Sequence, residues 1–317
     1  MIEACNLTKR FGQKLAVDDV SFTVQRGEVL GFLGPNGAGK TTTMRMLTGF
    51  LPPSEGTARI GGEDIIKSSL SARKKIGYLP ENAPVYHDMT VTGFLNFIAE
   101  IRGFSGAEKK QRVGVTIERC FLAEVRFQGI GTLSKGFKQR VCFAQSILHD
   151  PEYLIMDEPT DGLDPNQKHE VRGMIREMAR DKTIILSTHI LEEVDAVCTR
   201  AIIIAGGRIV ADDTPEGFRA RSATHGVVRL TLPGPVGSEV LAALESLPGV
   251  GSVASSKQEE PATVLLYPAN PGKSLLDEIS SFLRERDLEV QSLFVERGRL
   301  DEVFRAITTT TAGEVGS

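Results

Sequence analysis

Short apolar runs separated by turn residues mark the strands of this chain. Residues 2–30 alternate such runs with turns near Gly12 and Gly27, which predicts two or three strands. Apolar runs at 28–33 (EVLGFL), 153–157 (YLIMD) and 183–187 (TIILS) predict buried strands. Because stretches with helical spacing fall between these strands, the pattern predicts an α/β fold.

Residues 82–131 change to a helical period. Apolar residues follow one helical face from Phe94 to Ile101 and another from Val113 to Phe121. Gly103 and Gly106 break the pattern between them. The segment predicts an inserted helical subdomain, which at this size needs support from a larger core or a partner.

A change to small and polar residues at 219–225 marks a domain boundary. We expect a first domain over residues 1–221 and an accessory domain over 222–308. Alternating strands and helices in the second predict a small α/β sandwich, with a ferredoxin-like arrangement as a candidate. The tail 309–317 is expected to be disordered.

Composition narrows the classes of protein. The 317 residues are 41% hydrophobic and 25% charged, as in ordinary globular proteins, and the net charge of -4 gives no reason to expect a nucleic-acid partner. No apolar run approaches the roughly 20 residues that a membrane span requires, and no signal peptide is expected. The four scattered cysteines lack metal-ligand spacing and predict reduced core thiols in the cytosol.

Residues 34–41, GPNGAGKT, fit the pattern G-x-x-x-x-G-K-[ST] at each fixed position. A strand precedes them and a helix follows, which is the context of a phosphate-binding loop. Backbone N–H groups of such a loop converge on an anion, and the helix adds the positive end of its dipole. Lys40 is expected to reach the β- and γ-phosphates, and the Thr41 hydroxyl to hold Mg²⁺. The expected nucleotide-binding set is Gly34, Pro35, Asn36, Gly37, Ala38, Gly39, Lys40, Thr41 and Thr42.

Four further polar residues follow predicted strands, at the edge where α/β sheets bind ligands: Glu81, Asp157, Glu158 and His189. Asp157 is expected to hold the water shell of Mg²⁺, and Glu158 to orient or deprotonate the attacking water. The alternative for the two acids is a pair of solvated carboxylates at a strand exit. A lone histidine is most often structural, but the position of His189 at this edge favours a functional role.

Phe11 ends a predicted strand about two dozen positions before the loop. Its ring is suited to stacking on a purine, and a core position on an edge strand explains it equally well.

Taken in order, these segments resemble the ATP-binding subunit of ABC transporters over residues 2 to about 220. GPNGAGKT resembles the Walker A loop, LSKGFKQR (133–140) the signature motif and YLIMDE (153–158) the Walker B strand. DGLDP (161–165), with Asp164, resembles the D-loop, and His189 the switch histidine. Phe11 lies where the family places an aromatic residue that stacks on adenine.

Two positions depart from the family. Glu81 replaces the usual glutamine, and LSKGF replaces LSGGQ. Glu81 keeps an oxygen able to reach Mg²⁺ or its water, and Lys135 adds a cation that the resemblance places near the γ-phosphate of the opposite protomer. Gly136 is retained. YLPEN, LSKGF and the ending FVERGRLDEVF resemble the branch that powers ABC-2-type exporters of the gliding-motility, drug and polysaccharide systems.

The resemblance implies a P-loop NTPase core of ABC type, with an antiparallel β subdomain and the helical subdomain. It implies two ATP molecules sandwiched head to tail between two such subunits, each bridging Lys40 of one chain and Ser134 and Gly136 of the other. Hydrolysis by water that Glu158 orients, with His189 and Glu81 beside it, opens the dimer. The implied partners are an ABC-2-type membrane permease and a second copy or a related ATPase, with the chain on the cytoplasmic face of the membrane.

Two alternatives stay open. A soluble ABC ATPase acting on ribosomes or DNA is disfavoured by the single Walker A motif and by the lack of sustained heptads. The accessory domain is either a ligand sensor or an appendage that stabilises a dimer, and no polar cluster in its sequence marks a pocket.

Overall fold

The computed structural model describes residues 1–82, 84–255, 261–270 and 274–314. Two compact units are formed, one by residues 1–214 with the segment from Ile307, the other by residues 215–306. The first boundary falls seven residues before the expected end at 221, because the short helix α8 (Pro215–Arg219) belongs to the second unit.

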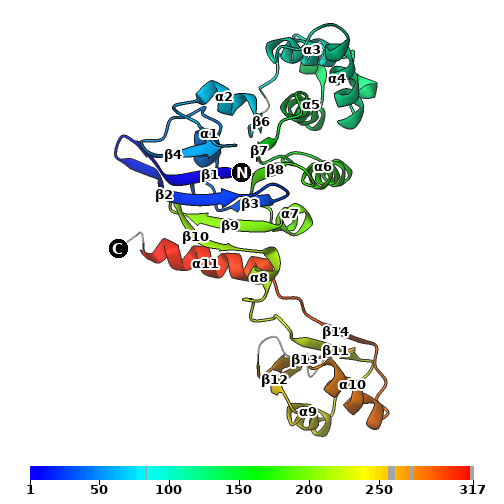
Figure 1. Cartoon of the computed structure of the whole chain (residues 1–317). Coiled ribbons are helices and arrows are strands. Elements are labelled where there is room, and N and C mark those ends of the chain that lie inside the picture. The colour runs from blue at the N-terminus through cyan, green and yellow to red at the C-terminus, as the bar shows by residue number, and fades with distance from the viewer. Residues whose placement is uncertain (83, 256–260, 271–273, 315–317) are drawn as a thin grey trace. The chain divides into compact units, whose positions relative to one another are not determined.

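A parallel sheet forms the centre of the first unit (Figure 1). Within the described residues its order is β10-β9-β3-β8-β7-β6, and only the β9–β10 hairpin is antiparallel. The strands are β3 (Val29–Leu33), β6 (Ile76–Leu79), β7 (Tyr153–Asp157), β8 (Thr183–Thr188), β9 (Arg200–Ala205) and β10 (Arg208–Asp213).

Both faces of this sheet are buried, which explains the uninterrupted apolar runs. Val29, Leu154 and Ile184 pack into a cluster with the helices of one face. Their neighbours Leu30 and Ile155 pack into a second cluster on the other face. The carboxyl ends of β3, β6, β7 and β8 therefore meet at one edge, as expected.

A smaller antiparallel sheet completes the second cluster, in the order β2-β1-β4-β5. Its strands are β1 (Ile2–Phe11), β2 (Lys14–Val24), β4 (Glu55–Ile60) and β5 (Glu63–Asp64). Helix α1 (Lys40–Leu47) contributes Met44, Met46 and Leu47 to the same cluster, and α2 (Ser69–Lys74) contributes Ala72. Helix α1, which follows the phosphate-binding loop, is therefore packed into the core.

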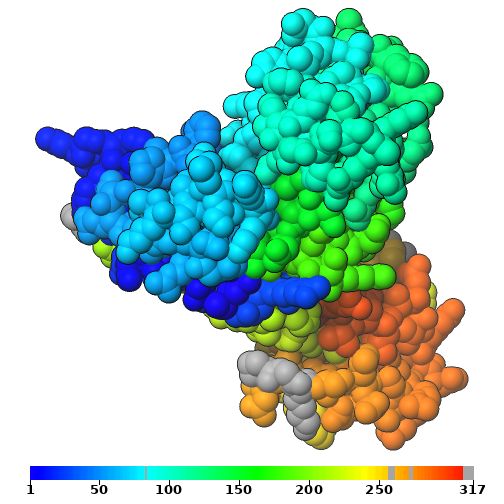
Figure 2. All heavy atoms as spheres, turned by 45° about the horizontal axis from the view of Figure 1, so that its top comes forward, coloured from blue at the N-terminus to red at the C-terminus, as the bar shows by residue number. Residues whose placement is uncertain are grey.

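The helical subdomain consists of α3 (Val91–Ile101) and α4 (Gly106–Arg119), followed by the short 3₁₀ turns η1 (Ala123–Val125) and η2 (Ile130–Thr132). Thr90 caps α3 by accepting a hydrogen bond from the Gly93 N–H, and Gly103 has a φ of 90° in the turn between the helices. The subdomain projects from the core as a lobe, cyan to green in Figure 2. Its apolar faces pack with α5 (Lys135–Ile147) and α6 (Pro165–Met178), which provide the support that its size demands.

The second unit has one antiparallel sheet of order β12-β13-β11-β14 in its described residues. Its elements run β11 (Val228–Leu232), α9 (Ser238–Glu245), β12 (Val250–Ser255), β13 (Ala262–Pro268), α10 (Leu276–Glu285) and β14 (Ser292–Val295). This βαββαβ sequence with that strand order is the ferredoxin-like arrangement, so the candidate named from the sequence is confirmed. Alternate residues of β11 and β13 pack with Ile279 and Leu283 of α10.

The tail at 309–317 was expected to be disordered, but the C-terminal helix α11 (Leu300–Glu314) extends into it. The helix continues through residues 309–314, and residues 315–317 lie outside the described part of the chain. Four consecutive threonines weakly oppose a helix, but that local preference amounts to only about 0.7 kcal/mol per residue or less. No helix in the described ranges has the length and apolar content to cross a membrane.

Candidate functional site

The loop between β3 and α1 has the backbone geometry of an anion cradle. Gly39 caps α1 with a φ of 110°, and Gly37 has a φ of 81°, both in the region that favours glycine. A Cβ atom on Gly34 would lie 2.4 Å from the carbonyl oxygen of Ile204, so this position also requires glycine. The sequence pattern and the local structure therefore agree at each glycine of the loop.

Lys40 begins α1, and its side chain folds back over the loop. Its Nζ donates to the carbonyl oxygens of Gly34 at 2.7 Å and Pro35 at 3.3 Å, and the residue is only 7% exposed. Burial lowers the pKa of Lys40 from its ordinary value, and the negative charges of Glu158, Asp157 and Glu81 oppose that shift. The ammonium group is thus the cation at the centre of a mostly acidic edge.

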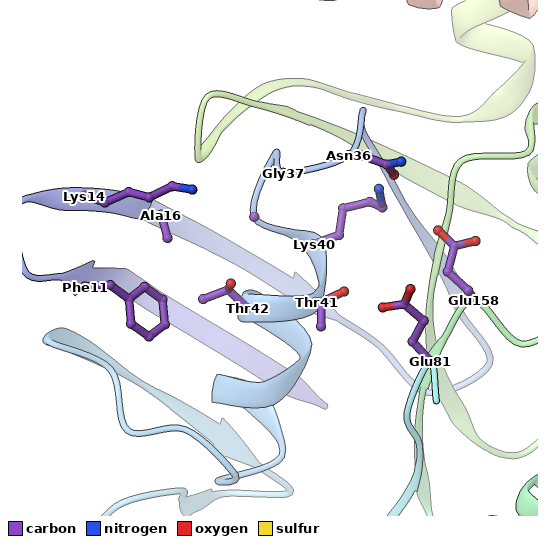
Figure 3. Close-up of a pocket in the computed structure, with 11 residues that line it drawn as sticks. Phe11, Lys14, Ala16, Asn36, Gly37, Lys40, Thr41, Thr42, Glu81 and Glu158 are labelled. Carbon is purple, nitrogen blue, oxygen red and sulfur yellow. The ribbon is translucent and has the colours of Figure 1, made fainter. Parts of the chain in front are cut away.

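A cavity of about 530 Å³ opens above this loop (Figure 3). The carboxylates of Glu81 and Glu158 point toward Lys40 and Thr41, while Phe11 lies on the other side of Thr42. Its lining is Phe11, Lys14, Ala16, Asn36, Gly37, Gly39, Lys40, Thr41, Thr42, Glu81 and Glu158. The structure therefore brings together most of the predicted nucleotide-binding residues in one place.

Phe11 is 50% exposed at the end of β1, which excludes the alternative of a core position. Lys14 and Ala16 were missed by sequence reasoning. Lys14 pairs directly with Phe11 across the β1–β2 hairpin, and Ala16 follows at the period of two that places both on one face. That alternation was the signal available in the sequence.

Asp157 ends β7 and is fully buried. Its Oδ1 accepts a hydrogen bond from the hydroxyl of Ser187, the β8 residue beside it in the sheet. Its Oδ2 is buried with no hydrogen-bond partner. A buried carboxylate oxygen without a partner is costly, and a cation at this edge would satisfy it. The donor set fits Mg²⁺, which is usually held by one or two carboxylates together with substrate phosphates.

No group of three or more His, Cys, Asp or Glu side chains suited to a metal occurs among the described residues. Asp157 and Thr41 are the residues that would hold Mg²⁺ here, together with water and oxygens of a bound nucleotide.

Glu158 and His189 contact each other across the ends of β7 and β8. His189 Nδ1 lies 3.0 Å from Glu158 Oε2, and the two side chains are 54% and 12% exposed. Glu158 has a φ of 50°, an uncommon value for a residue with a side chain. Its N–H donates to the backbone oxygen and the hydroxyl of Ser187, each at 3.2 Å, which holds this conformation. This contact favours a functional role for both residues over a solvated carboxylate and a structural histidine.

The predicted signature residues lie outside the cavity lining. Ser134 caps α5 by accepting from the Phe137 N–H, and Gly136 faces the side chain of Gln167 so closely that a Cβ would be 2.4 Å from its Oε1. Asp164 caps α6 and forms a capping box with Gln167. Lys135 donates to Asp161 of its own chain at 2.7 Å, and its expected place near a nucleotide of the opposite protomer stays a prediction.

Comparison with known proteins places this site in a family. Residues 17–161 match the family described as ABC transporter. The Nod factor export ATP-binding protein I of Paraburkholderia xenovorans is 39% identical, over 74% of this chain and 78% of that protein. The linearmycin resistance ATP-binding protein LnrL of Bacillus subtilis is 32% identical, over 98% of this chain and 99% of its own length. The chain belongs to the ABC transporter family of ATP-binding proteins.

The match to LnrL includes the accessory unit of this ABC protein. A probable multidrug ABC transporter ATP-binding protein of Escherichia coli, YbhF, is 38% identical over 224 residues, and the chain spans 39% of that protein's length. A solved ATP-binding subunit of an ABC transporter superposes with a TM-score of 0.64 at 31% identity, over 69% of this chain and 92% of that one. The ABC ATPase fold and the ATPase class predicted from the sequence are confirmed.

Proposed function

We propose that this chain is the ATP-hydrolysing motor subunit of an ABC-2-type export complex. The observation that carries the proposal is the contact of Glu158 with His189 at the rim of the cavity that Lys40 enters from the other side. A γ-phosphate held by Lys40 would lie between the ammonium group of Lys40 and the Glu158–His189 pair. Such an arrangement supports attack by a water molecule on that phosphate.

Glu158 is the proposed general base. Its Oε2 faces His189, and its side chain lines the cavity, so a water molecule beside it can be oriented toward the γ-phosphate. His189 is proposed to hold the carboxylate and to contact the phosphate that leaves. Mg²⁺, held by Thr41 and Asp157 with Glu81 beside them, would neutralise charge on the phosphate oxygens when the nucleotide is bound.

A second subunit is proposed to complete the site. Ser134 and Gly136 do not line the cavity of their own chain; Ser134 is the exposed N-cap of α5, and Gly136 is buried in its first turn. The open side of the cavity is thus available to the signature helix of another chain. We propose a head-to-tail dimer with two ATP molecules, in which hydrolysis removes the γ-phosphate bridge and lets the dimer open.

A basic groove between the core and the helical lobe is the proposed docking place for a membrane permease. Its volume is about 680 Å³, and Leu70 and Ile101 at its rim are 72% and 65% exposed. Arg73, Lys74 and Arg102 add positive charge. We propose that a cytoplasmic segment of the permease, apolar with an acidic residue, occupies it.

Strand β6 links this groove to the nucleotide cavity. Tyr78 lines the groove, and Glu81, three residues later, lines the cavity. A change in the position of a nucleotide near Glu81 is therefore proposed to reach the permease through this short strand. The similarity to a Nod factor export ATP-binding protein over 74% of this chain supports the exporter branch.

The test has two measurements on the purified chain. Light scattering after size exclusion should show that Glu158→Gln is a dimer with ATP and Mg²⁺ and a monomer without them, while Lys40→Ala, as the control, stays monomeric in both. Membranes that carry the permease should retain the wild-type chain and release Leu70→Arg/Ile101→Arg, whose ATPase activity in isolation is unchanged. Monomeric Glu158→Gln in ATP would refute the sandwich, and undiminished retention of the groove variant would refute the docking site and favour a soluble role.

A further inference from the structure

A buried carboxylate that takes no part in the cavity joins the two loops on which Glu158 and His189 stand. Glu193 lies in α7 (Leu191–Val197) and is 2% exposed. Its Oε1 accepts a hydrogen bond from the hydroxyl of Thr160, two residues after Glu158. Its Oε2 accepts from the hydroxyl of Thr188, the residue before His189, at 2.6 Å. One carboxylate therefore holds both catalytic loops.

Each threonine is itself fixed to the loop that it anchors. The Ile190 N–H donates to the Thr188 hydroxyl at 3.0 Å, so that hydroxyl spans the chain on both sides of His189. The Asp161 N–H donates to the Glu158 carbonyl oxygen at 3.1 Å, which closes the turn containing Thr160. Because Thr160 and Thr188 are buried, at 2% and 0% exposure, water does not compete for these bonds.

The charge on Glu193 has limited compensation. Arg172 of α6 places its Nη2 4.0 Å from Glu193 Oε1, and its Nε is buried without a hydrogen-bond partner. Burial raises the pKa of Glu193, and the hydroxyl of Thr188 and the charge of Arg172 act in the opposite direction. A buried carboxylate is expensive to retain where an apolar residue would pack, so its two hydroxyl contacts call for a role beyond packing.

We propose that Glu193 is a positioning residue that sets the separation of Glu158 and His189. The contact between those two side chains is made at 3.0 Å by residues from different strands, and one of the pair is 54% exposed. Glu193 joins the two loops through hydrogen bonds to Thr160 and Thr188, and all three side chains are buried from solvent. The inference rests on the proposed roles of Glu158 and His189 and names the group through which they are held.

The proposal predicts different effects on ATP affinity and on turnover. Lys40 and the loop residues that bind nucleotide make their hydrogen bonds apart from Glu193, so ATP affinity should be preserved when the bridge is cut. Turnover should fall, because displacing a catalytic group by about 1 Å costs on the order of 100-fold in rate.

The test compares threonine variants that keep or remove a hydroxyl. Thr160→Val and Thr188→Val should each lower kcat at least about 10-fold with the ATP Kd within about 2-fold of wild type, while Thr160→Ser and Thr188→Ser restore kcat. Thr116→Val, at a buried threonine of the helical lobe, is the control for losing a buried hydroxyl and should keep full activity. Glu193→Gln should resemble the valine variants, and these still decide the question if it does not fold.

A further comparison distinguishes positioning from general destabilisation. In the Glu158→Gln background, Thr160→Val should cause no additional loss of the residual rate, because the group that it positions is already gone. If Thr160→Val folds and has a normal kcat while Glu158→Gln is inactive, the proposed role of Glu193 is wrong and the proposed function of the site stands. Normal hydrolysis by Glu158→Gln would instead overturn the proposed function of the site, and parallel losses of kcat, Kd and melting temperature would show a purely structural bridge.

Discussion

The Nζ of Lys135 lies 2.7 Å from Oδ2 of Asp161, joining the first turn of α5 to the turn that follows β7. The lysine stem also covers Gly162, where a Cβ would lie 2.5 Å from its Cε and where φ is 71°. The hydrogen bond from Lys135 lowers the pKa of Asp161 below its usual range. The residue that departs from the family signature thus connects two predicted interface segments within one chain.

This pair should contribute little to folding and more to dimerisation. The two side chains are 69% and 47% exposed, so water screens the attraction, and an exposed ion pair is worth about 0–1 kcal/mol. Lys135→Gln and Asp161→Asn should each leave the melting temperature nearly unchanged. In a Glu158→Gln background, each should weaken ATP-dependent dimerisation, and the double variant should be no weaker than either single one. Additive losses would mean that the two residues act separately.

The lowered pKa of Lys40 predicts a pH dependence of nucleotide binding. Only the protonated amine attracts phosphates, so ATP affinity should fall as pH rises through the lowered pKa, before an ordinary lysine with a pKa of 10.5 would lose its proton. Bound phosphates raise that pKa again, and binding should take up a proton in this range. Calorimetry in two buffers of different ionisation enthalpy measures the uptake. Lys40→Arg, which stays charged, should bind with no uptake, and equal uptake in both proteins would contradict the assignment.

His149 predicts a different pH effect, on stability. Burial, and next the charge of Arg102, lower its pKa from 6.5 to about 4, and its Nε2 contacts the carbonyl oxygen of Ile76 at 3.0 Å. Between pH 6.5 and 4 the unfolded chain binds a proton that the folded chain does not. Stability should therefore fall as pH is lowered through this window, by up to about 3 kcal/mol.

Thermal melts of His149→Gln test this origin of the acid sensitivity. Glutamine keeps a donor for the Ile76 carbonyl and does not titrate, so the melting temperature should fall less between pH 6.5 and 4 than in the wild type. His169→Gln, at an exposed histidine of α6, serves as the control and should retain the wild-type slope. Identical slopes in all three proteins would assign the acid sensitivity to other groups.

The phosphate loop and the acidic strand ends were predictable because their chemistry is local. Glycine spacing fixes the loop, and the carboxyl ends of parallel strands meet without knowledge of the rest of the chain. Glu158 and His189 were named separately, but their contact depends on the β7–β8 pairing, which no short pattern encodes. The contact of Lys135 with Asp161, 26 positions away, was likewise not predictable, because it depends on how α5 packs beside the turn after β7.

The boundaries of elements were less predictable for physical reasons. Strand β12 (Val250–Ser255) has two small polar residues and a glycine, so it gave little apolar signal, and it forms by pairing with β13. The bridge through Glu193 was also missed, since a glutamate on a helix normally indicates a solvated face and only tertiary structure buries this one.

Glu158 as the general base is the central claim, and single-turnover hydrolysis with equilibrium binding on Glu158→Gln tests it most directly. Because the protein contains no tryptophan, a fluorescent nucleotide can report binding without interference. We expect the hydrolysis rate to fall by about 10²–10⁴-fold, the usual contribution of a general base, with the nucleotide Kd unchanged. Hydrolysis within a few-fold of wild type would contradict the account and would place the base elsewhere on the cavity wall.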